Sequence, residues 1–174
     1  MLKKSLLSTL LFFSLSTLQA QSVNSNESRV DFTVKNMAFN RVEGNFSGIE
    51  GMVNFSPKDL SNSSINICID ANTINTENKD RDTHLKNEDF FEVETYPTIC
   101  FEADKFEKIN EQFFTIGKLT MHGITKTVKI PFTYEDRHIK AVFKVLRKDY
   151  NIGENTGNFM VGNEIDIHII CSLN

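Results

Sequence analysis

The chain has 174 residues, of which 40% are hydrophobic, and its 19 basic and 23 acidic residues give a formal net charge of −4. This acidic balance excludes the basic footprint that nucleic-acid-binding proteins require, and it provides no electrostatic attraction to an anionic membrane surface. The length suits one domain, which would bury roughly two thirds of the surface of the unfolded chain.

The first twenty residues have the layout of a secretory signal peptide. Lys3 and Lys4 form a short basic start, an apolar and hydroxylic stretch follows, and Ala20 offers a small residue before a cut. The apolar stretch is too short to span a bilayer. We therefore expect residues 1–20 to be removed and residues 21–174 to form one exported domain, periplasmic or secreted, with no stable membrane insertion. Without the two lysines the 19 basic residues become 17 against 23 acidic ones, a net charge of −6.

The mature chain contains many short runs in which apolar and polar residues alternate, as in half-buried strands. This alternation predicts an antiparallel sheet with one apolar face. Turn signals at roughly 8–12-residue spacing predict a sandwich or a barrel, and full closure would leave no unpaired edge. Residues 113–116, Phe-Phe-Thr-Ile, fit either phase of a strand. In chain order, the apolar phase of the clear runs carries Val30, Phe32, Val34, Phe46, Ile49, Val53, Phe55, Ile65, Ile67, Ile69, Ile99, Phe101, Leu119, Met121, Val128, Ile130, Phe132, Ile139, Ala141, Phe143, Val145, Ile165, Ile167 and Ile169.

Residues 80–97 form a long segment that does not alternate. Its first half, Asp80 to Asp89, is rich in charge, its second half is aromatic at Phe90 and Phe91, and it stops at Pro97. Proline cannot continue a helix, and it also disfavours the helical conformation of the residue before it. We expect a short helical segment around residues 80–95 that covers an apolar interior.

Short motifs follow one another along nearly all of the mature chain. They are Ser28-x-Val30-x-Phe32-x-Val34, Val42-x-Gly44-x-Phe46, Gly51-x-Val53-x-Phe55-x-Pro57, Ile69-Asp70, Arg81-Asp82-x-His84-Leu85, Asp89-Phe90-Phe91-x-Val93-x-x-Tyr96-Pro97, Gly117-x-Leu119-Thr120-x-His122-Gly123-Ile124-Thr125-Lys126, Arg147-x-Asp149-Tyr150 and Val161-Gly162-Asn163-Glu164-Ile165. In this order they resemble the YceI-like polyisoprenoid-binding family. The resemblance implies an all-β, extended lipocalin-like antiparallel barrel of about eight strands, usually periplasmic, with a long apolar pore for isoprenoid chains. Members of the family often pair as homodimers.

A prenyl tail is long, branched and uncharged, so a protein recognises it by apolar area and shape. Each buried CH2 group contributes about 0.8 kcal/mol. Whether an inward side chain touches a ligand or simply fills a core stays open, because alternation marks the inner face and not a cavity. The candidate ligand-binding residues are Phe32, Val34, Phe46, Val53, Phe55, Ile67, Ile69, Phe90, Phe91, Phe101, Leu119, Ile130, Phe132, Phe143, Ile165 and Ile167.

Arg81 and His84 are the candidates for contact with a polar or phosphorylated headgroup. The alternative is that these two residues and Asp82 form a local salt-bridge and capping network that holds a short helix. The second interpretation needs no ligand.

Cys68 and Cys100 both occupy the polar phase of their strands, so both are expected to point outward. If those strands are antiparallel neighbours, as the order in the family implies, the two thiols lie opposite each other and form a disulfide in an exported protein. Cys171 shares the phase of Ile165 to Ile169 and is expected to be buried and free. Three unpaired thiols are the competing interpretation, because the register of the strands is not visible in the sequence.

Catalysis and metal binding are not expected. The four histidines, His84, His122, His138 and His168, lie on different segments without the clustered spacing of a zinc site. The Gly-x-Ser-x-Gly elbow of hydrolases is missing from the sequence. We therefore expect no enzymatic activity, no metal and no cofactor. A hydrolase or isomerase that acts on a bound lipid would need an inward polar cluster, and the alternation places none there.

Two functional classes remain. The first is an exported soluble protein that holds a polyisoprenoid, such as an isoprenoid quinone or a prenyl phosphate, in an apolar interior for storage or transport. The second is a secreted stress or surface interaction protein whose barrel is filled by its own side chains and carries no lipid. The small residues Gly44, Gly51 and Ala103 leave room inside, which favours the first class.

Overall fold

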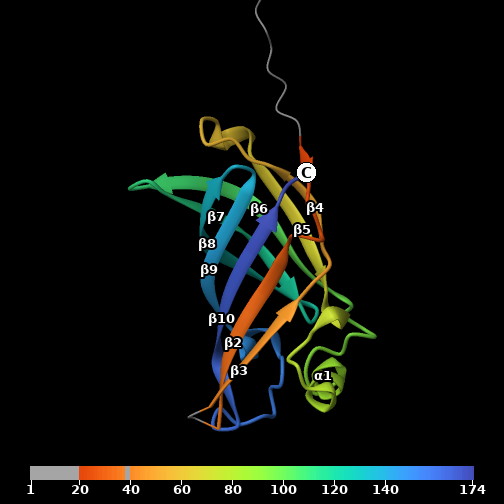
Figure 1. Cartoon of the computed structure of the whole chain (residues 1–174). Coiled ribbons are helices and arrows are strands. Elements are labelled where there is room, and N and C mark those ends of the chain that lie inside the picture. The colour runs from red at the N-terminus through yellow and green to blue at the C-terminus, as the bar shows by residue number, and fades with distance from the viewer. Residues whose placement is uncertain (1–19, 38–39) are drawn as a thin grey trace, which may run out of the picture.

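In the computed structural model, which describes residues 20–37 and 40–174, the chain forms one curled antiparallel sheet around an apolar interior (Figure 1). The prediction of an all-β, lipocalin-like fold is confirmed, with ten strands in the described part of the chain instead of about eight. The strands are β1 (Gln21–Ser22), β2 (Arg29–Asn36), β3 (Asn40–Phe46), β4 (Ile49–Asn54), β5 (Ser64–Asp70), β6 (Thr98–Ile109), β7 (Gln112–Met121), β8 (Ile124–Glu135), β9 (His138–Leu146) and β10 (Val161–Ser172). The helices are η1 (Leu60–Asn62), η2 (Ala71–Thr73), α1 (Lys79–Lys86) and η3 (Arg147–Tyr150).

The sheet has two edge strands, β1 and β3, which do not pair with each other over the residues that the structure describes. We call the gap between these two edges the seam. The strand order is β1-β4-β5-β6-β7-β8-β9-β10-β2-β3, so the ladder of β3 ends at β2 although β4 follows it in the chain. A turn at Ser47 and Gly48, where Gly48 has φ 70°, separates β3 from β4. Beside this seam, Asn45 and Asn75 exchange two backbone hydrogen bonds of 2.9 and 3.0 Å. Among the described residues, a second isolated bridge pairs Val23, just after β1, with Leu173, just after β10, so isolated bridges and not a full ladder link the two sides of the seam.

One end of the interior is filled by aromatic rings. Phe55 lies at the centre, with ring centroids 5.7 Å from Phe106, 5.2 Å from Phe113, 5.0 Å from Phe132 and 5.1 Å from Tyr134. Three of these four contacts are edge-to-face, the geometry that aromatic quadrupoles prefer. We call these five residues the aromatic end.

The ambiguous run at 113–116 settles into one phase on β7. Phe113 and Thr115 point inward, whereas Phe114 lies outside with the Lys129 ammonium 4.7 Å from its ring centroid. The buried phase thus contains a threonine. Its Oγ1 is buried and has no hydrogen-bond partner. The phase is the one that Leu119 and Met121 give when it is continued back along β7, and Phe113 packs within the aromatic end.

The expected helical segment is shorter than predicted. Helix α1 has eight residues, and the side chain of Asn78 caps its start by accepting a hydrogen bond from the Arg81 N–H. Residues 87–97 form turns: the N–H groups of Phe91 and Val93 donate back to Leu85 O and Lys86 O. The backbone turns and presents the aromatic half to the interior, which a continuous helix would not do.

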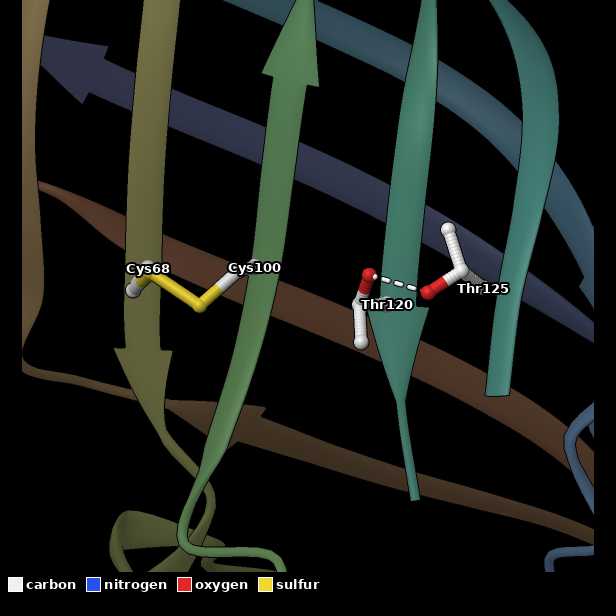
Figure 2. Close-up of a disulfide and its surroundings, with 4 residues drawn as sticks. All are labelled: Cys68, Cys100, Thr120 and Thr125. Atoms are coloured by element: carbon white, nitrogen blue, oxygen red, sulfur yellow. Dashed lines mark hydrogen bonds between the residues drawn. A yellow bond between two sulfur atoms is a disulfide. The ribbon is translucent and has the colours of Figure 1, made fainter. Parts of the chain in front are cut away.

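The structure joins Cys68 and Cys100 in a disulfide and leaves Cys171 buried and free. The two cysteines are directly opposite on β5 and β6, and the same row continues to Thr120 and Thr125, whose hydroxyls are 2.8 Å apart (Figure 2). This row lies on the outer face, in the phase opposite to the buried Ile69 and Phe101. Burial raises the pKa of the Cys171 thiol to about 11, so at neutral pH it stays protonated.

No helix in residues 20–37 and 40–174 has the length and the apolar character needed to cross a membrane. Apart from Ala20, the predicted signal peptide lies outside the described residues.

We predict that the denatured, unreduced protein exposes one thiol per chain and that the reduced protein exposes three. Labelling with a thiol-specific reagent followed by mass spectrometry measures both numbers. Two or three labelled cysteines without reductant would contradict the disulfide. In the folded protein, Cys171 should stay unlabelled because it is buried and its pKa is raised.

We also predict that the C68S/C100S variant loses about 4 kcal/mol of unfolding free energy. The disulfide closes a loop with a sequence separation of 32, and chain entropy gives a contribution of this size for such a loop. Denaturant unfolding of the wild type and the variant measures the difference. The T120V/T125V variant, altered in the same outer row, is the matched control and should lose less than about 1 kcal/mol.

Candidate functional site

The end of the interior opposite the aromatic end is hollow. It contains a cavity of about 420 Å³ that is partly open to solvent. Its wall comes from β2, β3, β5, β6, β7, β9 and β10, together with α1, the turns after α1 and the segment 147–161. Almost every side chain on this wall is apolar. Such a site recognises its occupant by shape and hydrocarbon area.

Most of the residues predicted to bind a ligand lie on this wall. The structure brings together Phe32, Val34, Phe46, Ile67, Ile69, Phe90, Phe91, Phe101, Leu119, Phe143, Ile165 and Ile167, and it places Arg81 and His84 at the same cavity. Four others lie elsewhere. Val53, Ile130 and Phe132 line a separate small cavity, and Phe55 is the centre of the aromatic end. These four share the inward phase, but their end of the sheet is packed.

The burial of inward side chains differs between the two ends. Phe132 and Ile130, near the aromatic end, are 2% and 5% exposed. Phe143, Val145 and Ile165 also face the interior, yet they are only half-buried. An apolar side chain on an inner face remains accessible only when it borders a void. The apolar surface of the hollow end is therefore available to a ligand.

The sequence suggested that Gly44 leaves empty space in the interior, but a neighbouring ring fills that space. A Cβ atom there would overlap the Phe32 ring, which lies across it from β2. Gly117 has a similar partner, because a Cβ there would lie 2.8 Å from Phe101 Cζ. The glycines therefore admit aromatic rings, and the empty space lies between the walls.

Arg81 is held by its own chain. Its Nε donates to Thr76 Oγ1 at 2.8 Å, and its Nη2 donates to the Thr76 carbonyl at 2.7 Å. The Asp82 carboxylate accepts from the Thr76 N–H at 2.8 Å and from the Thr76 hydroxyl at 2.5 Å. These contacts hold Arg81 and Asp82 through Thr76 and not through a salt bridge between Arg81, Asp82 and His84, which the alternative to headgroup binding predicts. They leave Nη1 as the one guanidinium nitrogen of Arg81 without a hydrogen bond to the described residues.

His84 also has local partners. Its Nε2 lies 3.5 Å from Asp89 Oδ2, and its ring meets the edge of Phe90 at 5.1 Å between centroids. Phe90 in turn packs against Gly153, where a Cβ would lie 2.6 Å from Phe90 Cε1. Although His84 borders the cavity, the acidic partner makes this corner a weak site for an anion.

Arg147 is a residue of the cavity wall that sequence reasoning did not single out for the site. Its guanidinium has five N–H donors, and each has a backbone carbonyl partner. Nε donates to Gly162 at 3.0 Å, Nη1 to Ile152 at 2.8 Å and to Gly153, and Nη2 to Thr156 at 2.8 Å and to Val161 at 2.9 Å. The side chain is 3% exposed, and burial lowers the pKa of its guanidinium. Arg147 thus organises the segment 151–162 and has no donor left for a ligand.

Other wall residues were missed for simpler reasons. Val30, Met121, Val145 and Ile169 lie in the inward phase of the predicted runs but were not chosen as ligand candidates, because alternation does not show which inward residues border a cavity. Ile74 and Ile152 lie outside the alternating runs, and no sequence pattern marks them.

Within residues 20–37 and 40–174, no group of three or more His, Cys, Asp or Glu side chains is arranged to hold a metal ion. His122 illustrates the structural use of such residues. Its Nδ1 lies 3.0 Å from the Tyr150 carbonyl, and its Nε2 lies 3.6 Å from Glu92 Oε2. It links the β7–β8 turn, where it has φ 49°, to two neighbouring segments.

Comparison with known proteins identifies the same fold over residues 22–173. The model of the YceI-like domain family matches residues 22–173. A curated relative, a UPF0312 protein of Pectobacterium carotovorum, is 28% identical over 174 residues, which cover 90% of this chain and 91% of the relative.

Two solved structures share the fold. BcnA of Burkholderia cenocepacia superposes with a TM-score of 0.77 at 23% identity, covering 86% of this chain and 98% of BcnA. A polyisoprenoid binding domain from Saccharophagus degradans superposes with a TM-score of 0.68 at 14% identity, covering 89% and 97%.

We predict that the conservative variant R147K lowers the unfolding free energy by about 3 kcal/mol. Lysine has three donors in place of five, so carbonyls of the segment 151–162 lose their partners, and each unpaired buried group costs about 1–3 kcal/mol. Denaturant unfolding gives the loss, and hydrogen exchange should show lower protection in this segment. The R41K variant, at an exposed arginine on β3, should change stability by less than about 0.5 kcal/mol. Equal stability of R147K and wild type would refute this role.

Proposed function

The chain belongs to the YceI-like family, and we propose that it binds a polyisoprenoid lipid in the hollow end of its sheet, for storage or transport. The observation that carries the proposal is the cavity of about 420 Å³ with its nearly uniform apolar wall. The fold shared with a polyisoprenoid binding domain supports the same ligand class. Burial of a prenyl tail there is favoured by about 0.8 kcal/mol per CH2 group.

The polar end of such a lipid would lie near α1, where Arg81 and His84 border the cavity. Two donor nitrogens of Arg81 are bound to Thr76, and Asp89 stands beside His84. Arg147 has no donor to offer. A neutral head, as in an isoprenoid quinone or a prenyl alcohol, therefore suits this corner better than a prenyl phosphate.

We also propose that the protein is exported to the periplasm or secreted after cleavage near Ala20. The basic start and short apolar stretch of residues 1–20 support this proposal, and so does a disulfide, which persists in oxidising compartments. Pairing as a homodimer stays a prediction.

The second candidate function is an interaction protein with a filled barrel and no cargo. The aromatic end favours it, because five rings pack there in close contact. The half-buried wall of the other end does not, since a filled barrel would bury Phe143, Val145 and Ile165 fully. No chemical step is needed in either function.

We expect the protein purified from its own host to carry a lipid of isoprenoid mass. Native mass spectrometry followed by solvent extraction would identify it, and the emptied protein should bind added prenyl alcohol or quinone. A protein that arrives empty and also refuses both ligands would be the filled barrel of the second candidate.

A substitution inside the cavity tests the location of the ligand. V145W places an indole in the hollow end from β9 and should weaken prenyl alcohol binding at least about tenfold, because it occupies volume that the tail needs. V142W, three residues earlier on the same strand, is the matched control. Val142 is 57% exposed on the outer face, so binding should change less than about twofold. Equal affinity of both variants would show that the tail binds elsewhere.

A further inference from the structure

The interior contains a second cavity of about 70 Å³ between the main cavity and the aromatic end. The two cavities share part of their lining. We call the side chains that line both of them the partition; they are Ile67, Phe101, Leu119, Phe143 and Ile169.

The strand register builds one side of the partition. Ile67 on β5 is opposite Phe101 on β6, and Phe101 is opposite Leu119 on β7, so the three form one row across the sheet. The ring of Phe101 rests against Gly117, which has room for it only because it lacks a Cβ atom. The Phe101 ring is therefore held in place by Gly117 at the centre of the row. Phe143 and Ile169 complete the partition from β9 and β10.

The space behind the partition holds little hydrocarbon. At about 70 Å³, the second cavity has room for about two non-hydrogen atoms. Beyond it, Phe132 leads into the aromatic end, so a tail finds no continuation there.

The volume of the main cavity limits the length of prenyl tail that it can hold. At about 30 Å³ for each non-hydrogen atom, the share of a water molecule in the liquid, a cavity of about 420 Å³ holds about 14 such atoms. That is a chain of about three isoprene units.

We infer that the partition is a length limit, so that the protein selects prenyl lipids by the first three or four isoprene units and gains nothing from a longer tail. This inference rests on the proposed function and names its specificity determinant. Phe101 is the central residue of the limit, because it belongs to the row and is buried.

The test measures dissociation constants of the emptied protein for farnesol, geranylgeraniol and solanesol, by native mass spectrometry from detergent micelles. The wild type should bind geranylgeraniol and solanesol within about threefold of each other, because the extra units of solanesol stay outside. F101A should raise the preference for geranylgeraniol over farnesol at least about tenfold relative to the wild type, since removing the ring opens room for about one more isoprene unit.

The controls separate the inference from general damage. F106A removes a ring from the same strand at the aromatic end, behind both cavities, and should keep the wild-type length preference. F143A opens the partition from β9 and serves if F101A does not fold.

Three results would overturn the inference. In the first, wild-type affinity rises steadily up to solanesol, and in the second, a folded partition variant keeps the wild-type preference. Both leave the proposed function intact. The third, in which the wild type binds no prenyl alcohol of any length, overturns the proposed function together with this inference.

Discussion

The inner face of the curled sheet encloses more space than its own side chains occupy, and the rest of the structure depends on this mismatch. Barrels of about eight strands have an interior that side chains just fill or that holds one small ligand. Here both outcomes occur in one molecule. The rings around Phe55 fill one end, with centroids 5.0 to 5.7 Å apart, while the other end keeps about 420 Å³. Protein interiors normally pack without voids of this size, so the hollow end is built to be occupied.

A hollow end cannot be held together by packing across its centre, and polar side chains take over that task. Arg147 binds five carbonyls on one side. On another side, Thr76, Arg81 and Asp82 tie α1 to the segment before it. Hydrogen bonds that involve a charged group are stronger than neutral ones, which suits them to walls with few apolar neighbours. The arginines that border the cavity therefore hydrogen-bond to neighbouring segments of the protein.

The sequence was sufficient for the fold class and for most of the cavity wall, because alternation reports which side chains face inward. It could not separate Phe132 from Phe143, which have the same phase and type but lie at the filled and the hollow end. That difference depends on the distance between opposite walls, which no single strand encodes. The run at 113–116 was ambiguous when taken alone because each of its phases contains a phenylalanine. Arg147 gave no sign of its role, since its five partners are backbone atoms and carry no side-chain pattern.

The position of the disulfide is related to the position of the main cavity. Cys68 lies between Ile67 and Ile69 on β5, and Cys100 lies beside Phe101 on β6, so the bond joins two strands that border the main cavity. The inner side chains of these strands, among them Ile67, Ile69 and Phe101, border the main cavity. A covalent link on the outer face restrains the strands where interior packing is weakest. At the aromatic end, where Phe55 and Phe132 lie in close contact, the strands need no such link. The disulfide, the Arg147 contacts and the network of Thr76, Arg81 and Asp82 all lie beside the hollow end, and together they restrain the walls of the apolar cavity.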